Sequence, residues 1–320
     1  MNLIQLFKIA ILALVQGAAE LLPVSSSAHV VVFKRLLGYQ TNSDFEWAFL
    51  LVMLHTGTMF SVLLYFWSRW KPLFKYWPQL LGATIVTGGL GLGLVKGIEH
   101  FFLRGADGEK NGTIESLFQQ LPLVAIALTA AGVVIIAAGT KEARSPGTIE
   151  TLNWPHALIT GVVQGICIPF RGFSRSGATI SAEMFLGIQR MRAEEFSFAL
   201  AVLLTPAVIG YEGLKLIRDH QESVKKLVTL QSSSPAEVAH SLAGDIGPLL
   251  MPGLFGMVFS FVAGLLALKL LSAWMERGHW RWFGYYCLVA AAVVLTLHYV
   301  LPMEIKPAAT TTVTAPVESK

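Results

Sequence analysis

Two short polar segments, far apart in an otherwise apolar chain, contain the residues that could do chemistry. The first, ELLPVSSSAH, spans residues 20–29 and holds a carboxylate, three serines and a histidine. The second, PFRGFSRSGAT, spans residues 169–179 and holds two arginines and further hydroxyl groups. The arginine fork matches phosphate oxygens, a serine can act as a nucleophile, and a carboxylate or imidazole can move a proton. If the two segments meet, they supply what phosphoryl transfer requires.

The rest of the chain indicates that a lipid bilayer is a large part of its solvent. Of 320 residues, 54 % are hydrophobic and 14 % are charged, whereas soluble domains average about 25 % charged. This balance excludes a disordered protein, a coiled coil and almost any soluble globular domain. The net charge is only +4 and no basic cluster resembles a nucleic-acid site, so we expect no nucleic-acid partner. The two cysteines lie in apolar runs and indicate no disulfide framework or metal motif.

Six continuous apolar runs are long enough for transmembrane helices, which need about 20 residues. They are residues 45–67, 78–98, 121–139, 195–217, 247–271 and 283–301. Residues 3–37 and 156–190 are also apolar, but the two polar segments interrupt them. Irregular backbone at membrane depth is tolerated only where it is buried in protein or faces a wet cavity. We therefore predict two re-entrant helix–loop–helix hairpins, with each half too short to span the membrane.

The two interrupted segments resemble each other at a constant offset of 148 residues. This offset relates the pairs Gln16 and Gln164, Ser26 and Ser174, and Glu46 and Glu194. Each half then has one hairpin and three spans, and because three is odd the second half is inverted relative to the first. We predict an all-α polytopic integral membrane protein with one membrane domain over residues 1–302, whose repeat halves are about 1–140 and 150–302. Residues 303–320 are expected to form a disordered tail.

Loop charge predicts the orientation of the chain in the membrane. The segment 68–77 contains Arg69, Lys71 and Lys75 and no acidic residue, whereas the segment 99–120 contains four acidic residues against two basic ones. The positive-inside rule places the first segment in the cytoplasm and both termini outside.

The strings QGAAELLPVSSSAH and GFSRSGATIS resemble the two signature motifs of the bacterial undecaprenyl-diphosphatase family, the bacitracin-resistance phosphatases. The predicted spans and hairpins are also similar to that family over nearly the whole chain. The resemblance implies hydrolysis of undecaprenyl diphosphate to the monophosphate and inorganic phosphate, which recycles the lipid carrier for cell-wall synthesis and confers bacitracin resistance. It also implies a multi-pass enzyme of the bacterial inner membrane, with a periplasmic site and a divalent cation, magnesium or calcium.

The resemblance further implies roles for individual residues. The catalytic set is Glu20, Ser26, His29 and Arg175, with Glu20 as a metal ligand or acid/base and Ser26 as the nucleophile or a phosphate-binding serine. The resemblance also implies substrate-binding roles for Ser27, Ser174 and Thr179. Ser176 and Arg171 are further candidates for phosphate binding because of their residue types in the second polar segment.

Some positions depart from the family pattern. Gln16 stands where some members have a second glutamate, so a metal that both positions hold would have one fewer anionic ligand. Arg171 stands where the family usually has proline, and it either adds a charge near the site or pairs with Glu183. Ala28 replaces the usual glycine before the histidine, which limits backbone freedom there.

Other hypotheses remain open at this point. A transporter or flippase for the lipid carrier would use the same inverted repeat, broken helices and arginines. A type 2 phosphatidic acid phosphatase has a second histidine after its Ser-Arg element, but this chain has none between Arg175 and His220. An inert scaffold does not explain two polar segments inside the bilayer. Within a predicted span, His55 is expected to pack rather than to catalyse. The choice between a phosphoserine intermediate and direct water attack, and the existence of a homodimer, are not decided by the sequence.

Overall fold

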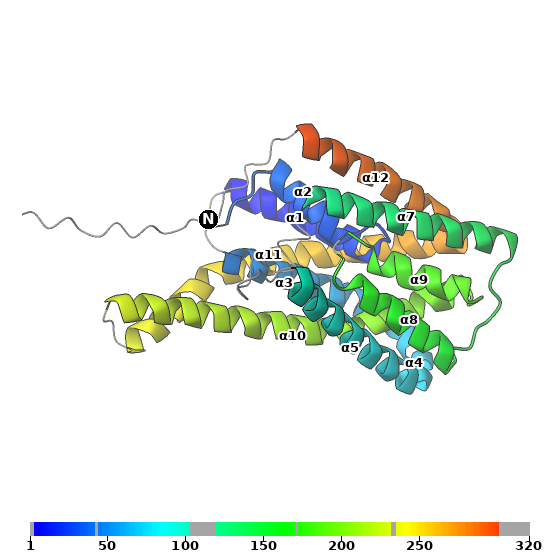
Figure 1. Cartoon of the computed structure of the whole chain (residues 1–320), viewed down its shortest axis with the longest axis horizontal. Coiled ribbons are helices and arrows are strands. Elements are labelled where there is room, and N and C mark those ends of the chain that lie inside the picture. Colours follow the sequence, from blue (N-terminus) through cyan, green and yellow to red (C-terminus); the bar gives the residue numbers. More distant parts are fainter. Residues whose placement is uncertain (1–2, 42–43, 103–119, 171, 232–234, 301–320) are drawn as a thin grey trace, which may run out of the picture.

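The computed structural model describes residues 3–41, 44–102, 120–170, 172–231 and 235–300, and within these ranges the regular elements are helices (Figure 1). The first half contains α1 (Leu3–Leu21), α2 (Ser26–Leu36), α3 (Asp44–Tyr65), η1 (Trp67–Arg69), α4 (Trp70–Leu73), η2 (Phe74–Tyr76), α5 (Trp77–Phe102) and α7 (Leu121–Arg144). The second half contains α8 (Trp154–Cys167), α9 (Arg175–Phe185), α10 (Arg190–Gln231), α11 (Pro235–Glu276) and α12 (Trp280–Val300). The expected all-α fold is therefore confirmed.

In the described part of the chain, seven helical segments are long and apolar enough to cross a membrane. They are Leu3–Leu21, Phe45–Tyr65, Trp67–Phe101, Leu121–Arg144, Arg190–Tyr211, Leu249–Glu276 and Trp280–Val300. Six of these fall on the predicted spans, which confirms the polytopic character. The seventh is α1, whose 19 residues make it longer than the half-hairpin expected from the sequence. By contrast α2, α8 and α9 have 11, 14 and 11 residues and are too short to span.

Each polar segment breaks a helix where the sequence predicts it. Helix α1 ends at Leu21 and α2 begins at Ser26, while α8 ends at Cys167 and α9 begins at Arg175. The second break requires a glycine, because Gly172 has φ +103° and a Cβ there would lie 2.9 Å from the carbonyl oxygen of Val124. The two helices on either side of each break pack against each other. How these helix pairs lie relative to a membrane stays a prediction.

Each broken helix pair also packs against a long helix from the other half of the chain. Helix α1 packs on α11, and α8 packs on α5. Small residues allow these close approaches, since a Cβ at Gly17 would lie 2.4 Å from the Ser260 carbonyl oxygen and one at Gly161 would lie 2.7 Å from that of Ala83. The helix pair of each half thus packs on a long helix of the other half, as expected if the two halves are intertwined. The boundaries of the repeat stay a prediction.

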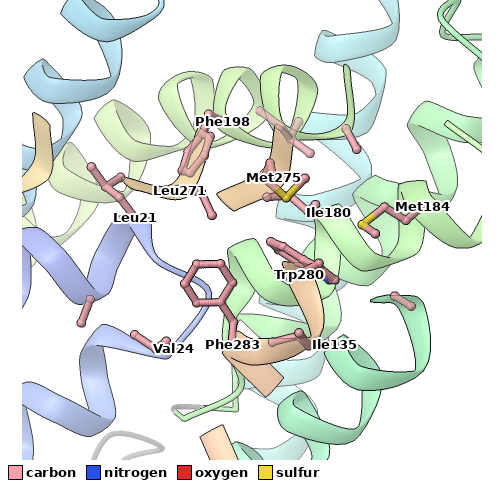
Figure 2. Close-up of a cluster of buried hydrophobic side chains, with 14 of the residues drawn as sticks. Leu21, Val24, Ile135, Ile180, Met184, Phe198, Leu271, Met275, Trp280 and Phe283 are labelled. Carbon is pink, nitrogen blue, oxygen red and sulfur yellow. The ribbon is translucent and has the colours of Figure 1, made fainter. Parts of the chain in front are cut away.

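A hydrophobic cluster holds the two breaks in place. Figure 2 shows part of it: Leu21, Val24, Ile135, Ile180, Met184, Phe198, Leu271, Met275, Trp280 and Phe283. Leu21 and Val24 border the first break, whereas Ile180 and Met184 belong to α9, directly after the second. Trp280 is almost fully buried among them, and its Nε1 donates a hydrogen bond to Ser181 Oγ at 3.1 Å. Since both breaks are packed against one cluster, their relative position is fixed by the core.

Ion pairs join the segment 68–77 and several helix ends. Arg69 lies 3.4 Å and Arg192 2.8 Å from carboxylate oxygens of Glu195, and Arg190 lies 3.3 Å from Glu142. These contacts link the segment after α3 to the start of α10, and the end of α7 to the same start. The basic residues Arg69, Arg190 and Arg192 therefore gather at one end of the bundle.

Candidate active site

The two polar breaks meet around a cavity of about 150 Å³. Its lining consists of Ala19, Glu20, Ser25, Ser26, Ser27, Cys167, Ile168, Phe170, Phe173, Ser174, Arg175 and Ser176. Residues from the first break thus face residues from the second, as the sequence analysis requires of a phosphoryl-transfer site. A direct bond joins the two loops, because the backbone N–H of Gly172 donates to Ser27 Oγ at 3.2 Å.

Glu20 and Arg175 form an ion pair across this cavity. Arg175 Nη2 lies 2.7 Å from Glu20 Oε1, and the two side chains are only 25 % and 16 % exposed. An ion pair with so little solvent around it is screened much less than a surface pair. Arginine has five N–H donors, so contact through Nη2 leaves further donors for a second anion in the cavity.

The other oxygen of the Glu20 carboxylate accepts two hydrogen bonds. Ser26 Oγ donates to Oε2 at 2.5 Å, and Gln16 Nε2 donates to the same atom at 3.1 Å. Gln16 and Glu20 lie four residues apart in α1 and therefore share one helix face. The carboxylate is fixed by partners on both oxygens, with the Ser26 hydroxyl hydrogen directed at it.

Two helix N-termini also border the cavity. Ser26 is the first residue of α2 and Arg175 is the first residue of α9, and both line the cavity. Ser174 caps α9 by accepting a hydrogen bond from the Gly177 N–H at 3.2 Å. Helix N-termini carry partial positive charge and free N–H groups, so they attract phosphate. Together with Arg175 they make the cavity suited to an anion.

The residue before Ser26 has an unusual backbone conformation. Ser25 lies at φ +67° and ψ 95°, and it is the one non-glycine residue with positive φ in the described ranges. Its hydroxyl lies 3.3 Å from Ser27 Oγ instead of capping the helix. Such conformations cost about 1–3 kcal/mol and persist only where surrounding contacts enforce them, often at active sites. The serines at this break are functional candidates from the sequence, but no residue pattern indicates this backbone conformation.

Three residues that the sequence analysis assigns to the site lie elsewhere or outside the described residues. His29 does not line the cavity, because its ring faces Ser25 O and Tyr286 Oη. Thr179 is fully buried behind the cavity, where its Oγ1 donates to the Arg175 carbonyl oxygen at 2.9 Å and lies 2.6 Å from Ser197 Oγ. Thr179 thus supports the backbone of Arg175. Arg171 lies outside the described residues, and so does the choice between a charge near the site and a pairing with Glu183.

Glu183 has a partner in the described part of the chain. Its fully buried side chain accepts a hydrogen bond from Thr160 Oγ1, which links α9 to α8 within the second helix pair.

The structure places His55 next to Glu20, whereas the sequence predicts a packing role for it. Its Nε2 lies 3.7 Å from Glu20 Oε2, its Nδ1 lies 2.8 Å from the Leu51 carbonyl oxygen, and its side chain is 39 % exposed. A polar residue inside an apolar span was the signal that could have identified it. The contact of Tyr286 with His29 could not be predicted from the sequence. A tyrosine in the last span has no spacing that relates it to the first polar segment.

The described side chains fit a divalent cation only if the substrate shares it. Among the described residues, no group of three or more histidine, cysteine, aspartate or glutamate side chains could hold a metal ion. Glu20 is the one carboxylate in the described cavity lining, and the neighbouring groups are serine hydroxyls and the Gln16 amide. Mg²⁺ often binds through one or two carboxylates plus substrate phosphates, which matches this set.

Fold and site together define a polytopic membrane protein with a cavity between two broken helices, where a carboxylate and a serine confront an arginine. Residues 9–293 match the family described as Bacitracin resistance protein BacA, and the chain belongs to this family. The family membership expected from the two motifs is therefore confirmed.

Several curated proteins are similar to the chain over nearly their whole length. Undecaprenyl-diphosphatase 2 of Acinetobacter baylyi is 50 % identical over 307 residues, which cover 93 % of this chain and 98 % of that protein. The undecaprenyl-diphosphatase of Rhodopirellula baltica is 32 % identical over 298 residues, with coverage of 92 % and 98 %. That of Halothermothrix orenii is 29 % identical over 297 residues, with the same coverage.

Proposed function

We propose that the chain hydrolyses undecaprenyl diphosphate to undecaprenyl phosphate and inorganic phosphate. The observation that supports this most is the joint binding of the Glu20 carboxylate by Arg175 and Ser26 in a cavity between two helix N-termini. The names of the similar proteins support the choice of substrate. The reaction recycles the lipid carrier for cell-wall synthesis and confers resistance to bacitracin.

Arg175 and the N-termini of α2 and α9 bind the diphosphate in this proposal. The Arg175 donors that do not contact Glu20 are free to bind phosphate oxygens in a bidentate manner. Because this charge stays in place before substrate binds, little reorganisation is needed as negative charge shifts in the transition state.

Ser26 acts as the nucleophile, and Glu20 takes its proton. The hydroxyl already donates to Glu20 Oε2, so the proton has an acceptor as Ser26 Oγ attacks the terminal phosphorus. The new O–P bond forms while the bond to the bridging oxygen breaks, and undecaprenyl phosphate leaves. Water then attacks the phosphoserine and the P–O bond to Ser26 breaks. Glu20 returns its proton to Ser26 Oγ, one proton of the water passes to solvent, and the other stays on the inorganic phosphate, which is released as hydrogen phosphate.

Glu20, with Gln16 and the neighbouring serine hydroxyls, would hold a divalent cation, magnesium or calcium. Such a cation supplies neutralising positive charge at the phosphate oxygens. The Arg175 guanidinium supplies the same kind of charge from the opposite side of the cavity.

The site lies within the bacterial inner membrane and opens to the periplasm. In this arrangement both helix pairs re-enter the membrane, the polyprenyl tail lies between helices in lipid, and the bundle end with the Arg69, Arg190 and Arg192 ion pairs faces the cytoplasm. The gathering of basic residues at that end supports the orientation under the positive-inside rule.

Phosphate release tests the proposal. Purified protein in detergent is incubated with undecaprenyl diphosphate, and inorganic phosphate is measured with added Mg²⁺ or Ca²⁺ and with a chelator. We expect release that depends on protein and cation. A transporter of the lipid carrier would release none, and that result would overturn the proposed activity.

A further inference from the structure

His29 and Tyr286 form a contact between the first 30 residues and the last helix. His29 lies in the first turns of α2, and Tyr286 belongs to α12. His29 Nε2 is 2.7 Å from Tyr286 Oη, and the two rings are nearly parallel, with centroids 5.6 Å apart and planes at 12°. The other ring nitrogen, Nδ1, lies 2.8 Å from the carbonyl oxygen of Ser25.

These partners determine the tautomer of a neutral His29. A carbonyl oxygen can only accept, so Nδ1 must bear the hydrogen that it donates to Ser25. The neutral ring then has its lone pair on Nε2, and Tyr286 Oη donates to it. Both ring nitrogens are thus engaged with groups outside the Glu20–Arg175 pair, and the ring is held at both ends.

The carbonyl that His29 binds belongs to the residue with the unusual backbone. Ser25 has φ +67° and directly precedes Ser26. Its carbonyl oxygen also accepts the His29 backbone N–H, but at 3.4 Å, so the side-chain bond is the shorter of the two. Since such a conformation persists only when surrounding contacts enforce it, the His29 ring is a principal support of the turn that presents Ser26 to Glu20.

Helix α12 holds the other side of the same break. The thiol of Cys287, the neighbour of Tyr286, donates to the carbonyl oxygen of Pro23 at 3.4 Å. Phe283, one turn earlier, belongs with Val24 to the hydrophobic cluster of Figure 2. Helix α12 therefore contacts residues on both sides of Ser25. Cys287 bonds to Pro23 before it, and Tyr286 bonds to His29 after it.

We propose that Tyr286 is a positioning residue for the reaction, which acts through His29. Tyr286 fixes the tautomer and orientation of the imidazole, the imidazole fixes the Ser25 peptide, and this peptide places Ser26 Oγ against Glu20. His29 is then a positioning residue too, in place of the proton carrier expected from the sequence. This inference rests on the proposed function, because it requires Ser26 to be the group that attacks the phosphorus.

Substitutions at His29 separate positioning from proton transfer. The amide nitrogen of asparagine occupies nearly the place of Nδ1 and can donate to Ser25 O, but it cannot take up a proton. We expect His29→Asn to be at least about tenfold more active than His29→Ala in phosphate release, since it retains a hydrogen bond at the same place. Equal loss in both variants would contradict a positioning role.

Tyr286→Phe removes only the hydroxyl and leaves the ring stacked on His29. We expect kcat to fall by about threefold to tenfold with KM nearly unchanged, because the diphosphate does not contact this residue. The control is Tyr285→Phe, since Tyr285 packs on Trp282 beside it, and we expect wild-type activity. Wild-type kcat in Tyr286→Phe would overturn the proposal.

NMR spectroscopy tests the contact between His29 and Tyr286 without a measurement of phosphate release. In protein labelled with ¹⁵N-histidine, with the His29 signal assigned through His29→Asn, we expect the tautomer with hydrogen on Nδ1. Tyr286→Phe should shift the Nε2 resonance, whereas Tyr285→Phe should not. The opposite tautomer, or an unshifted resonance, would refute the contact even in a preparation that releases no phosphate.

Discussion

Glu20 and Arg175, which are 155 residues apart in the chain, lie 2.7 Å apart at their charged ends. Each belongs to a different helix pair, and each helix pair packs on a long helix of the opposite half. Burial of one of these charges without the other would be strongly unfavourable. Each charge therefore needs the other where the two breaks meet, and the pair keeps the guanidinium in the cavity before substrate arrives.

The position of Ser26 leads to a prediction about the covalent intermediate. Its hydroxyl donates to Glu20 at 2.5 Å, so we expect a phosphoserine to form at this residue during turnover. Rapid acid quenching followed by mass spectrometry of the peptide should detect it in wild type. Ser27→Ala, which changes a neighbouring serine bonded to Gly172, should still form the intermediate. Ser26→Ala with nearly normal phosphate release would show that water attacks directly.

The amide at Gln16 sets the anionic charge near Glu20. Gln16→Glu would place a second carboxylate about where Nε2 now lies 3.1 Å from Glu20 Oε2. Two carboxylates at this distance repel each other, and a bound cation relieves the repulsion. We expect the variant to reach half-maximal activity at a lower Mg²⁺ concentration and to need more chelator for the same loss of activity. The same Mg²⁺ dependence as wild type would argue against a cation held between these positions.

Gly172 enables the turn of the second break. Gly172→Ala would force a Cβ to within 2.9 Å of the Val124 carbonyl oxygen at φ +103°, which costs about 1–3 kcal/mol. We expect a lower melting temperature in detergent and reduced phosphate release, because the Gly172 N–H also bonds Ser27. Gly88→Ala is the control, since a Cβ there meets no atom within 4 Å. Equal melting temperatures for both variants would show that the turn tolerates a side chain.

The sequence predicted the helices and the two breaks because their signals are local. Long apolar runs determine the spans, and Pro23 and Gly172 mark the breaks. The length of α1 was underestimated because the polar segment that interrupts it begins at Glu20 in the sequence. In the structure the helix continues to Leu21, and Gln16 donates to Glu20 from the same helix face.

Contacts between elements that are distant in the sequence could not be predicted from local sequence patterns. Ser197 behind Thr179, Tyr286 against His29 and His55 beside Glu20 all depend on how whole helices pack. No spacing in the chain relates residues 29 and 286. The meeting of Glu20 with Arg175 could be anticipated only because a buried carboxylate and a buried arginine each need a partner inside a membrane.

Phosphate release from undecaprenyl diphosphate by Arg175→Ala, compared with wild type in detergent, tests the central claim most directly. We expect a loss of at least about a hundredfold, because preorganised charge at the transferring phosphate is worth several kcal/mol. Glu20→Ala should lose activity to a similar degree. Arg277→Ala, at an exposed arginine after α11, should retain wild-type activity. Near-normal release by Arg175→Ala in folded protein would contradict the assignment of the site.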